Sequence, residues 1–132
     1  IIFDGGVPKD MQNALNSILK SSRADSNNLV KVEIKNFMYK EYDVYAGDAL
    51  RSLETEVKSS IELRINSKKI INKKLSSMKR FNSNELNPLA DSEMKIFIKR
   101  ELYMDLINQL VMEVALIDLW CQLFIEIYRY IL

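Results

Sequence analysis

The sequence predicts an all-α fold, a helical hairpin or small helical bundle with a long, coiled-coil-like C-terminal helix. The 132 residues include only three Gly and two Pro, so the tight turns that a many-stranded sheet needs are scarce. Apolar residues make up 48% and charged residues 28%. This balance is typical of a globular chain and excludes both a disordered chain and a multi-span membrane protein. Apolar residues also recur at helical spacing towards both ends of the chain.

The N-terminal segment, residues 1–28, is expected to contain one short amphipathic helix. Pro8 suits an early helical position, where its missing N–H costs nothing. Over residues 9–21 the apolar side chains recur every three or four positions, at Met11, Ala14, Leu15, Ile18 and Leu19. The polar run that begins at Ser21 is expected to end the helix.

The middle segment, residues 29–80, is interpreted as a helix or helix pair with a basic C-terminal half. Residues 29–45 fit two structures, since Val30, Val32 and Ile34 alternate with charged residues as in a strand, whereas Val30, Ile34 and Phe37 also suit a helix. We favour the helix because a lone strand would leave its backbone groups without partners. From residue 46 to 80 the apolar positions step by three or four, which indicates a long amphipathic helix ending near Arg80.

Residues 81–91 are predicted to be a connecting loop, and residues 92–132 a long apolar helix. The loop prediction depends on a cluster of turn-forming residues around Asn87 and Pro88. Within the helix, apolar residues alternate in steps of four and three and form a helix-packing seam. The seam consists of Tyr103, Ile107, Leu110, Val114, Ile117, Cys121, Phe124, Tyr128 and Ile131. This spacing leaves open whether the partner helix belongs to the same chain or to another chain.

A second apolar set lies on another side of the same helix. It consists of Met112, Leu116, Leu119, Trp120, Leu123, Ile127 and Tyr130. Two weaker helices cannot cover both sides, and a bare apolar flank of this size exceeds what ordinary monomers expose. We therefore expect a partner interface here, filled by one or more helical proteins, with a hetero-oligomer favoured over a homo-oligomer.

The segment from Lys58 to Arg80 is strongly basic. It holds eight basic residues and one acid, Glu62, for a local charge of +7 within a chain of net charge +1. The candidate basic patch is Lys68, Lys69, Lys73, Lys74, Lys79 and Arg80. A solvated helix face is the favoured interpretation. Contact with an acidic partner or with nucleic acid is a weaker alternative.

The missing residue types restrict the chemistry. There is no His, which excludes His-dependent catalysis and His-bound zinc. The single cysteine excludes an intrachain disulfide and favours a reducing intracellular location, cytoplasm or nucleus. No Gly-rich phosphate loop and no signal peptide is recognised, and a start without Met suggests a fragment of a longer protein. We predict no catalytic, cofactor-binding or metal-binding residues and expect no enzyme activity.

The function predicted from these patterns is that of a non-catalytic helical scaffold subunit, which assembles with partner proteins through its C-terminal helix. The first alternative is an adaptor that binds nucleic acid or an acidic surface through residues 58–80. The second alternative is a membrane-associated helix. Glu113 and Asp118 disfavour it, because central acids in the apolar window 106–125 make insertion costly.

Overall fold

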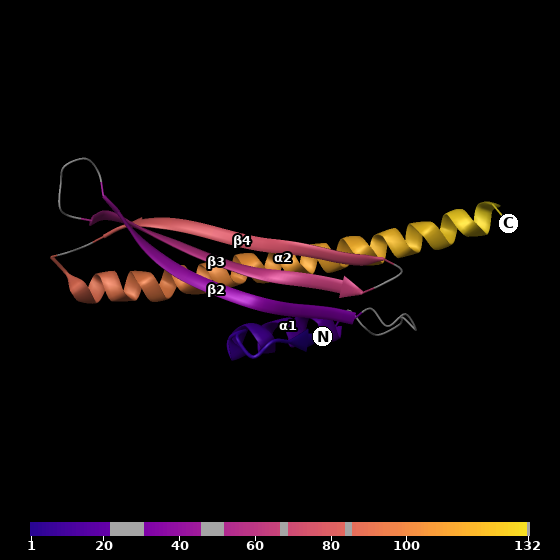
Figure 1. The fold of residues 1–132 in the computed structure, drawn as a ribbon, viewed down its shortest axis with the longest axis horizontal. Coiled ribbons are helices and arrows are strands. Elements are labelled where there is room, and N and C mark those ends of the chain that lie inside the picture. The colour runs from indigo at the N-terminus through magenta and orange to yellow at the C-terminus, as the bar shows by residue number, and fades with distance from the viewer. Residues whose placement is uncertain (22–30, 46–51, 67–68, 84–85, 132) are drawn as a thin grey trace.

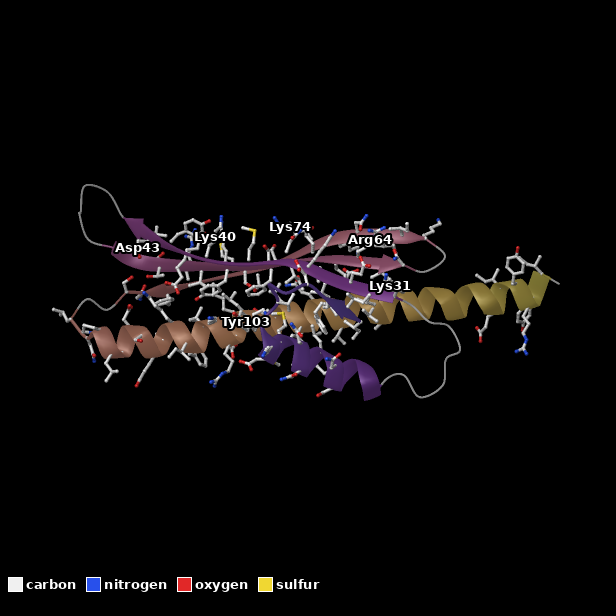
Figure 2. The ribbon with its side chains drawn as sticks, turned by 60° about the horizontal axis from the view of Figure 1, so that its bottom comes forward. Lys31, Lys40, Asp43, Arg64, Lys74 and Tyr103 are labelled. Atoms are coloured by element: carbon white, nitrogen blue, oxygen red, sulfur yellow. The ribbon has the colours of Figure 1, made fainter. Side chains whose placement is uncertain are left out.

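The computed structural model describes residues 1–21, 31–45, 52–66, 69–83 and 86–131. Two helices lie against one face of a four-stranded sheet, and the opposite face of the sheet is open (Figures 1 and 2). The elements follow in the order β1 (Ile2–Phe3), α1 (Lys9–Ser21), β2 (Lys31–Tyr45), β3 (Ser52–Asn66), β4 (Ile70–Asn82) and α2 (Pro88–Ile131).

The sheet has the strand order β1-β2-β3-β4. The strands β2, β3 and β4 are antiparallel neighbours, and the two-residue β1 pairs with β2 in parallel. In β3 the odd-numbered residues Val57, Ile61 and Ile65 are buried beneath the helices. The even-numbered residues between them, such as Lys58 and Arg64, lie on the open face.

The all-α prediction is wrong. The fold is mixed: among the described residues, 45 lie in strands and 57 lie in helices. The helix predicted over 29–45 is a strand, and the helix predicted over 46–80 is replaced by β3 and β4 in its described part. The prediction was wrong because apolar residues four positions apart fit both structures. Val57, Ile61 and Ile65 would share one face of a helix, and they equally share one face of a strand. The expected lack of a strand partner also failed, since three long strands pair with one another.

Helices are present in two of the regions where the sequence predicts them. The short N-terminal helix is α1, which begins at Lys9 and ends at Ser21. The long C-terminal helix is α2, which starts at Pro88, four residues before the predicted segment, and continues to Ile131. Within the range predicted as a loop, β4 occupies Phe81 and Asn82.

The core lies between the inner face of the sheet and the helices. Leu102, Leu106 and Leu110 of α2 are fully buried there, as is Leu15 of α1. They pack with β2 and β3 side chains in two clusters, the larger of which joins both helices to the sheet. Burying one such side chain stabilises the fold by about 1.5–3 kcal/mol.

Helix α2 is longer than the sheet that it covers. Its 44 residues span about 66 Å, and its C-terminal part extends past the ends of the strands (Figure 1). Tyr130 is 95% exposed and Ile131 is 78% exposed in this overhang.

Candidate functional site on the open face of the sheet

The two-residue period of β4 divides the basic segment between the two faces of the sheet. Lys73 and Lys79 lie on the inner face and pair with acids of α2. Lys74 and Arg80 lie on the open face, where Figure 2 shows Lys74 directed away from α2. Lys69 is exposed next to β4, and Lys68 lies outside the described residues. The residues predicted as one basic patch therefore belong to two different surfaces.

The inner pairs hold α2 against β4. Lys73 Nζ donates to Glu113 Oε2 at 2.6 Å. Lys79 Nζ lies 3.4 Å from Glu101 Oε2 and 3.6 Å from Asp105 Oδ2. These contacts pair two of the basic residues within the fold, so these two residues have a structural role.

A hollow of about 500 Å³ lies at the centre of the open face. It is lined by three lysines, four serines, two methionines and a tyrosine. These are Lys40, Lys58, Lys74, Ser59, Ser60, Ser76, Ser77, Met38, Met78 and Tyr42. Met38, Ser60 and Ser76 pair directly across β2, β3 and β4. The two small serines sit between longer side chains of the neighbouring rows, which produces the hollow.

The hollow carries positive charge. Lys40 lies directly opposite Lys58 in the β2–β3 register, an arrangement of like charges that is normally unfavourable. Lys58 Nζ is 3.1 Å from Glu56 Oε1, which offsets one of the two charges. Neither Lys40 nor Lys74 forms an ion pair with any other described residue. Together with the serine hydroxyls, these ammonium groups can hold an anionic group.

Glu56 is the acid that limits this positive charge. Its carboxylate accepts hydrogen bonds from Lys58 and Arg80, and these hold the pKa of Glu56 below its usual value. Arg80 Nη2 lies 2.7 Å from Glu56 Oε2. The ionised form of Glu56 is therefore favoured, and its charge offsets those of Lys58 and Arg80.

A second hollow, of about 480 Å³, lies between α1 and α2. Its walls are mainly apolar and include Met11, Ala14 and Ile107. Beside it, Lys99 Nζ lies 5.0 Å from the centre of the Tyr39 ring and 5.8 Å from that of Tyr103. Burial, with a smaller contribution from the negative charge of Asp10, raises the pKa of Tyr103.

The predicted packing seam is packed in the core along the first part of α2 and is exposed at the described end of the helix. Ile107 and Leu110 are buried, and Tyr103, Val114 and Ile117 pack against the same core, which also contains side chains of the sheet and of α1. Tyr128 and Ile131 are exposed in the overhang. The side chains of Cys121 and Phe124 lie outside the described set.

The predicted partner interface is exposed wherever its side chains are described. These are Met112, Leu116, Ile127 and Tyr130. The side chains of Leu119, Trp120 and Leu123 lie outside the described set. The described members therefore lie on the surface of this chain.

The described residues contain neither a metal-binding cluster nor a membrane-spanning helix. They contain no group of three or more acidic, His or Cys side chains placed to hold a metal ion. None of the described helix segments combines the length and apolarity that a membrane span requires.

No protein-family model and no curated protein matches the sequence. Solved structures match the fold. Rare lipoprotein B from Shewanella oneidensis is similar with a TM-score of 0.76 at 9% identity, over 92% of this chain and 96% of that chain. A minor lipoprotein from Acinetobacter baumannii is similar with a TM-score of 0.69 at 10% identity, over 89% of each chain. This fold is thus shared with two bacterial lipoproteins.

These similarities contradict several predictions. A helical scaffold subunit, with its helical-bundle and coiled-coil architecture, does not agree with a sheet-rich fold shared with lipoproteins. The nucleic-acid or acidic-surface adaptor and the membrane-associated helix gain no support either. The intracellular location, inferred from a single cysteine, is contradicted by the two lipoprotein structures. One cysteine is a weak indicator of compartment, because a fold with a continuous apolar core does not need disulfides.

Sequence reasoning missed the open-face hollow. Lys40, Ser60 and Ser76 were not singled out, although each lies in a stretch where polar and apolar residues alternate. A strand interpretation of all three stretches would have placed these side chains on one face. Their meeting in one hollow depends on the register between the strands, which period-two alternation does not specify.

Proposed function

We propose that this chain is the folded domain of a bacterial envelope lipoprotein, and that it acts by binding rather than by catalysis. The observation that carries the proposal is the fold similarity to rare lipoprotein B, which extends over 92% of this chain and 96% of the other. Such nearly complete coverage of both chains indicates a common whole-domain architecture rather than a shared motif.

The side-chain chemistry supports a binding role. The chain has no His, and the central hollow of the open face presents lysines and serines without an adjacent carboxylate pair for acid–base chemistry. The apolar hollow between α1 and α2 likewise offers contact area rather than reacting groups.

Acyl labelling of the natural full-length protein in its own bacterium tests this proposal. After growth with an alkyne-tagged palmitate, we expect the label on the protein and the protein in the membrane pellet and the detergent phase of a Triton X-114 extraction. A Cys121→Ser variant should keep the label, because Cys121 lies within helix α2 of the folded domain. Recovery of unlabelled protein from the soluble cytosolic fraction would contradict the proposal.

A further inference from the structure

The strand β4 ends the sheet with a long, regular edge. It pairs with β3 without interruption from Ile70 to Asn82 and has no second strand neighbour among the described residues. Edge strands are usually protected by being short, by Pro, by a bulge or by charged side chains, and β4 has only the last of these. β4 has 13 residues, no Pro and an unbroken register with β3. By contrast, the β2–β3 ladder contains two register shifts.

One flank of α2 follows this edge. The Gln109 side-chain amide donates to the Ser76 carbonyl at 3.1 Å, and the Ser77 hydroxyl lies 3.1 Å from Asp105 Oδ2. Three and seven residues after Gln109, the same stripe of the helix presents Met112 and Leu116. These side chains are 66% and 48% exposed. Met112 and Leu116 therefore form an exposed apolar strip on α2, on the same side of the helix as the contact between Gln109 and β4.

The charges of β4 indicate what fits this edge. The strand carries four basic residues and no acid, and its inner cations already pair with α2. On the open face, Arg80 shares Glu56 with Lys58, and Lys74 forms no ion pair with another described residue. A strand added to this edge would place one set of alternate side chains over Met112 and Leu116. The other set would lie beside Lys74 and Arg80.

A second copy of the chain does not fit this edge. An antiparallel pairing of two β4 strands about Ser77 would place Lys74 directly opposite Arg80, and neither of these cations pairs with α2. It would also bring four cations from each copy together without an acid from either strand. Directly opposed like charges destabilise a ladder. The same argument favours acids in an incoming strand.

We propose that the free edge of β4 is completed by an extended segment of a partner protein in which acidic residues alternate with apolar ones. Main-chain hydrogen bonds to the edge supply the affinity, and the two faces of the added strand supply the specificity. The inference does not depend on lipid anchoring. A rival role for the cations, discouraging any strand from pairing, is one of the outcomes of the test.

The test uses three synthetic nine-residue peptides and the full chain. The first peptide alternates Glu with Val. The second is the same peptide with every second amide N-methylated, which keeps the charge and removes edge hydrogen bonds. The third has Lys in place of Glu. Calorimetric titration should show binding of the first peptide, and binding at least tenfold weaker for the other two. Hydrogen exchange should show new protection at alternate amides of β4.

Single variants locate the binding site. Lys74→Glu should weaken binding of the Glu–Val peptide about fivefold or more, and Met112→Asp should do the same from the helix side. Lys9→Glu is the matched charge control, since Lys9 is exposed on α1, which does not pack against β4. It should leave the affinity unchanged.

Two results would overturn the proposal. Equal binding of the N-methylated peptide would show attraction by charge alone. Absence of binding by all three peptides would show that the edge does not accept a strand. If Lys74→Glu then causes the chain to self-associate, the cations serve only to protect the edge.

Discussion

Asn36 determines which side chains of β2 face the helices. It has a φ of 53°, and the β2–β3 register shifts between Lys35 and Met38, with one extra residue on β2. Before this bulge the inward residues are even-numbered, as at Ile34. After it they are odd-numbered, as at Tyr39. The bulge therefore brings Tyr39 beneath the sheet and leaves Lys40 in the open-face hollow.

Substitutions at Asn36 should separate backbone strain from hydrogen bonding. Asn36→Gly keeps the positive φ and loses only the exposed hydrogen bond to Glu62, so its free energy of unfolding should change by less than about 0.5 kcal/mol. Asn36→Ala should cost about 1 kcal/mol more than Asn36→Gly, because a Cβ disfavours this backbone conformation. Urea denaturation measures both. Equal losses would assign the effect to the contact with Glu62.

Tyr39 should make stability depend on pH in alkali. Burial and the hydrogen bond to Glu41 raise the pKa of Tyr39 above its usual value of 10.0. The unfolded chain then loses the phenolic proton first, so the stabilisation is complete below about pH 10 and is lost as the pH rises further. Denaturation from pH 8 to 11 should show this fall, and Tyr39→Phe should reduce it. An identical alkaline profile for both proteins would exclude Tyr39 as its source.

The sequence could predict neither of these residue-scale features. Asn tolerates a positive φ but also occurs throughout ordinary loops and strands, so residue 36 alone does not indicate a bulge. The raised pKa of Tyr39 depends on burial beneath α2 and on the bulge that turns its ring inward.

At the scale of elements, α2 consists of two parts with different roles. From Ile98 to Leu110 its inward side chains are buried against the sheet and α1. Near Tyr130 it is exposed beyond the strands (Figure 1). Buried side chains hold the first part in place, whereas the described end of the second contributes surface.

Truncations along α2 should reveal this division. Leu110→Ala removes a fully buried side chain and should lower the free energy of unfolding by about 2–5 kcal/mol. Tyr130→Ala should change it by less than about 0.5 kcal/mol, because the residue is exposed. Thermal and urea denaturation of the monomeric chain test the contrast. A large loss for Tyr130→Ala would show that the overhang packs in solution.

The elements themselves were only partly predictable. The faces of α1 and α2 were recognisable because steps of three between apolar residues, as from Met11 to Ala14 and from Ile107 to Leu110, cannot occur on one face of a strand. In β3 and β4 the inward residues step by two and four, as at Ile61, Leu63 and Ile65, and a step of four fits both structures. The polar residues that alternate with Ile61, Leu63 and Ile65 are the observation that favours a strand over a helix here.

At the scale of the whole molecule, the helices cover one face of the sheet and leave the other exposed. This division explains why residues 58–80 could not be interpreted as one patch. Lys73 and Lys74 are adjacent in sequence, yet one pairs with Glu113 of α2 and the other lines the open-face hollow. Sequence alternation could predict that separation once strands are assumed. The hollow itself depends on the register of Met38, Ser60 and Ser76 across three strands.

A single core connects α1, the sheet and α2, so a change in the short helix should destabilise the whole fold. Leu15 is fully buried in the cluster that contains Ile34, Ile61 and Leu106. Leu15→Ala should therefore cost about 2–5 kcal/mol, whereas the exposed Ser17→Ala on the same helix should be nearly neutral. The Leu15→Ala midpoint should shift equally in far-UV circular dichroism and in tyrosine near-UV signals, because unfolding is cooperative. Separate midpoints for the two signals would instead show that α1 detaches while the sheet and α2 remain folded.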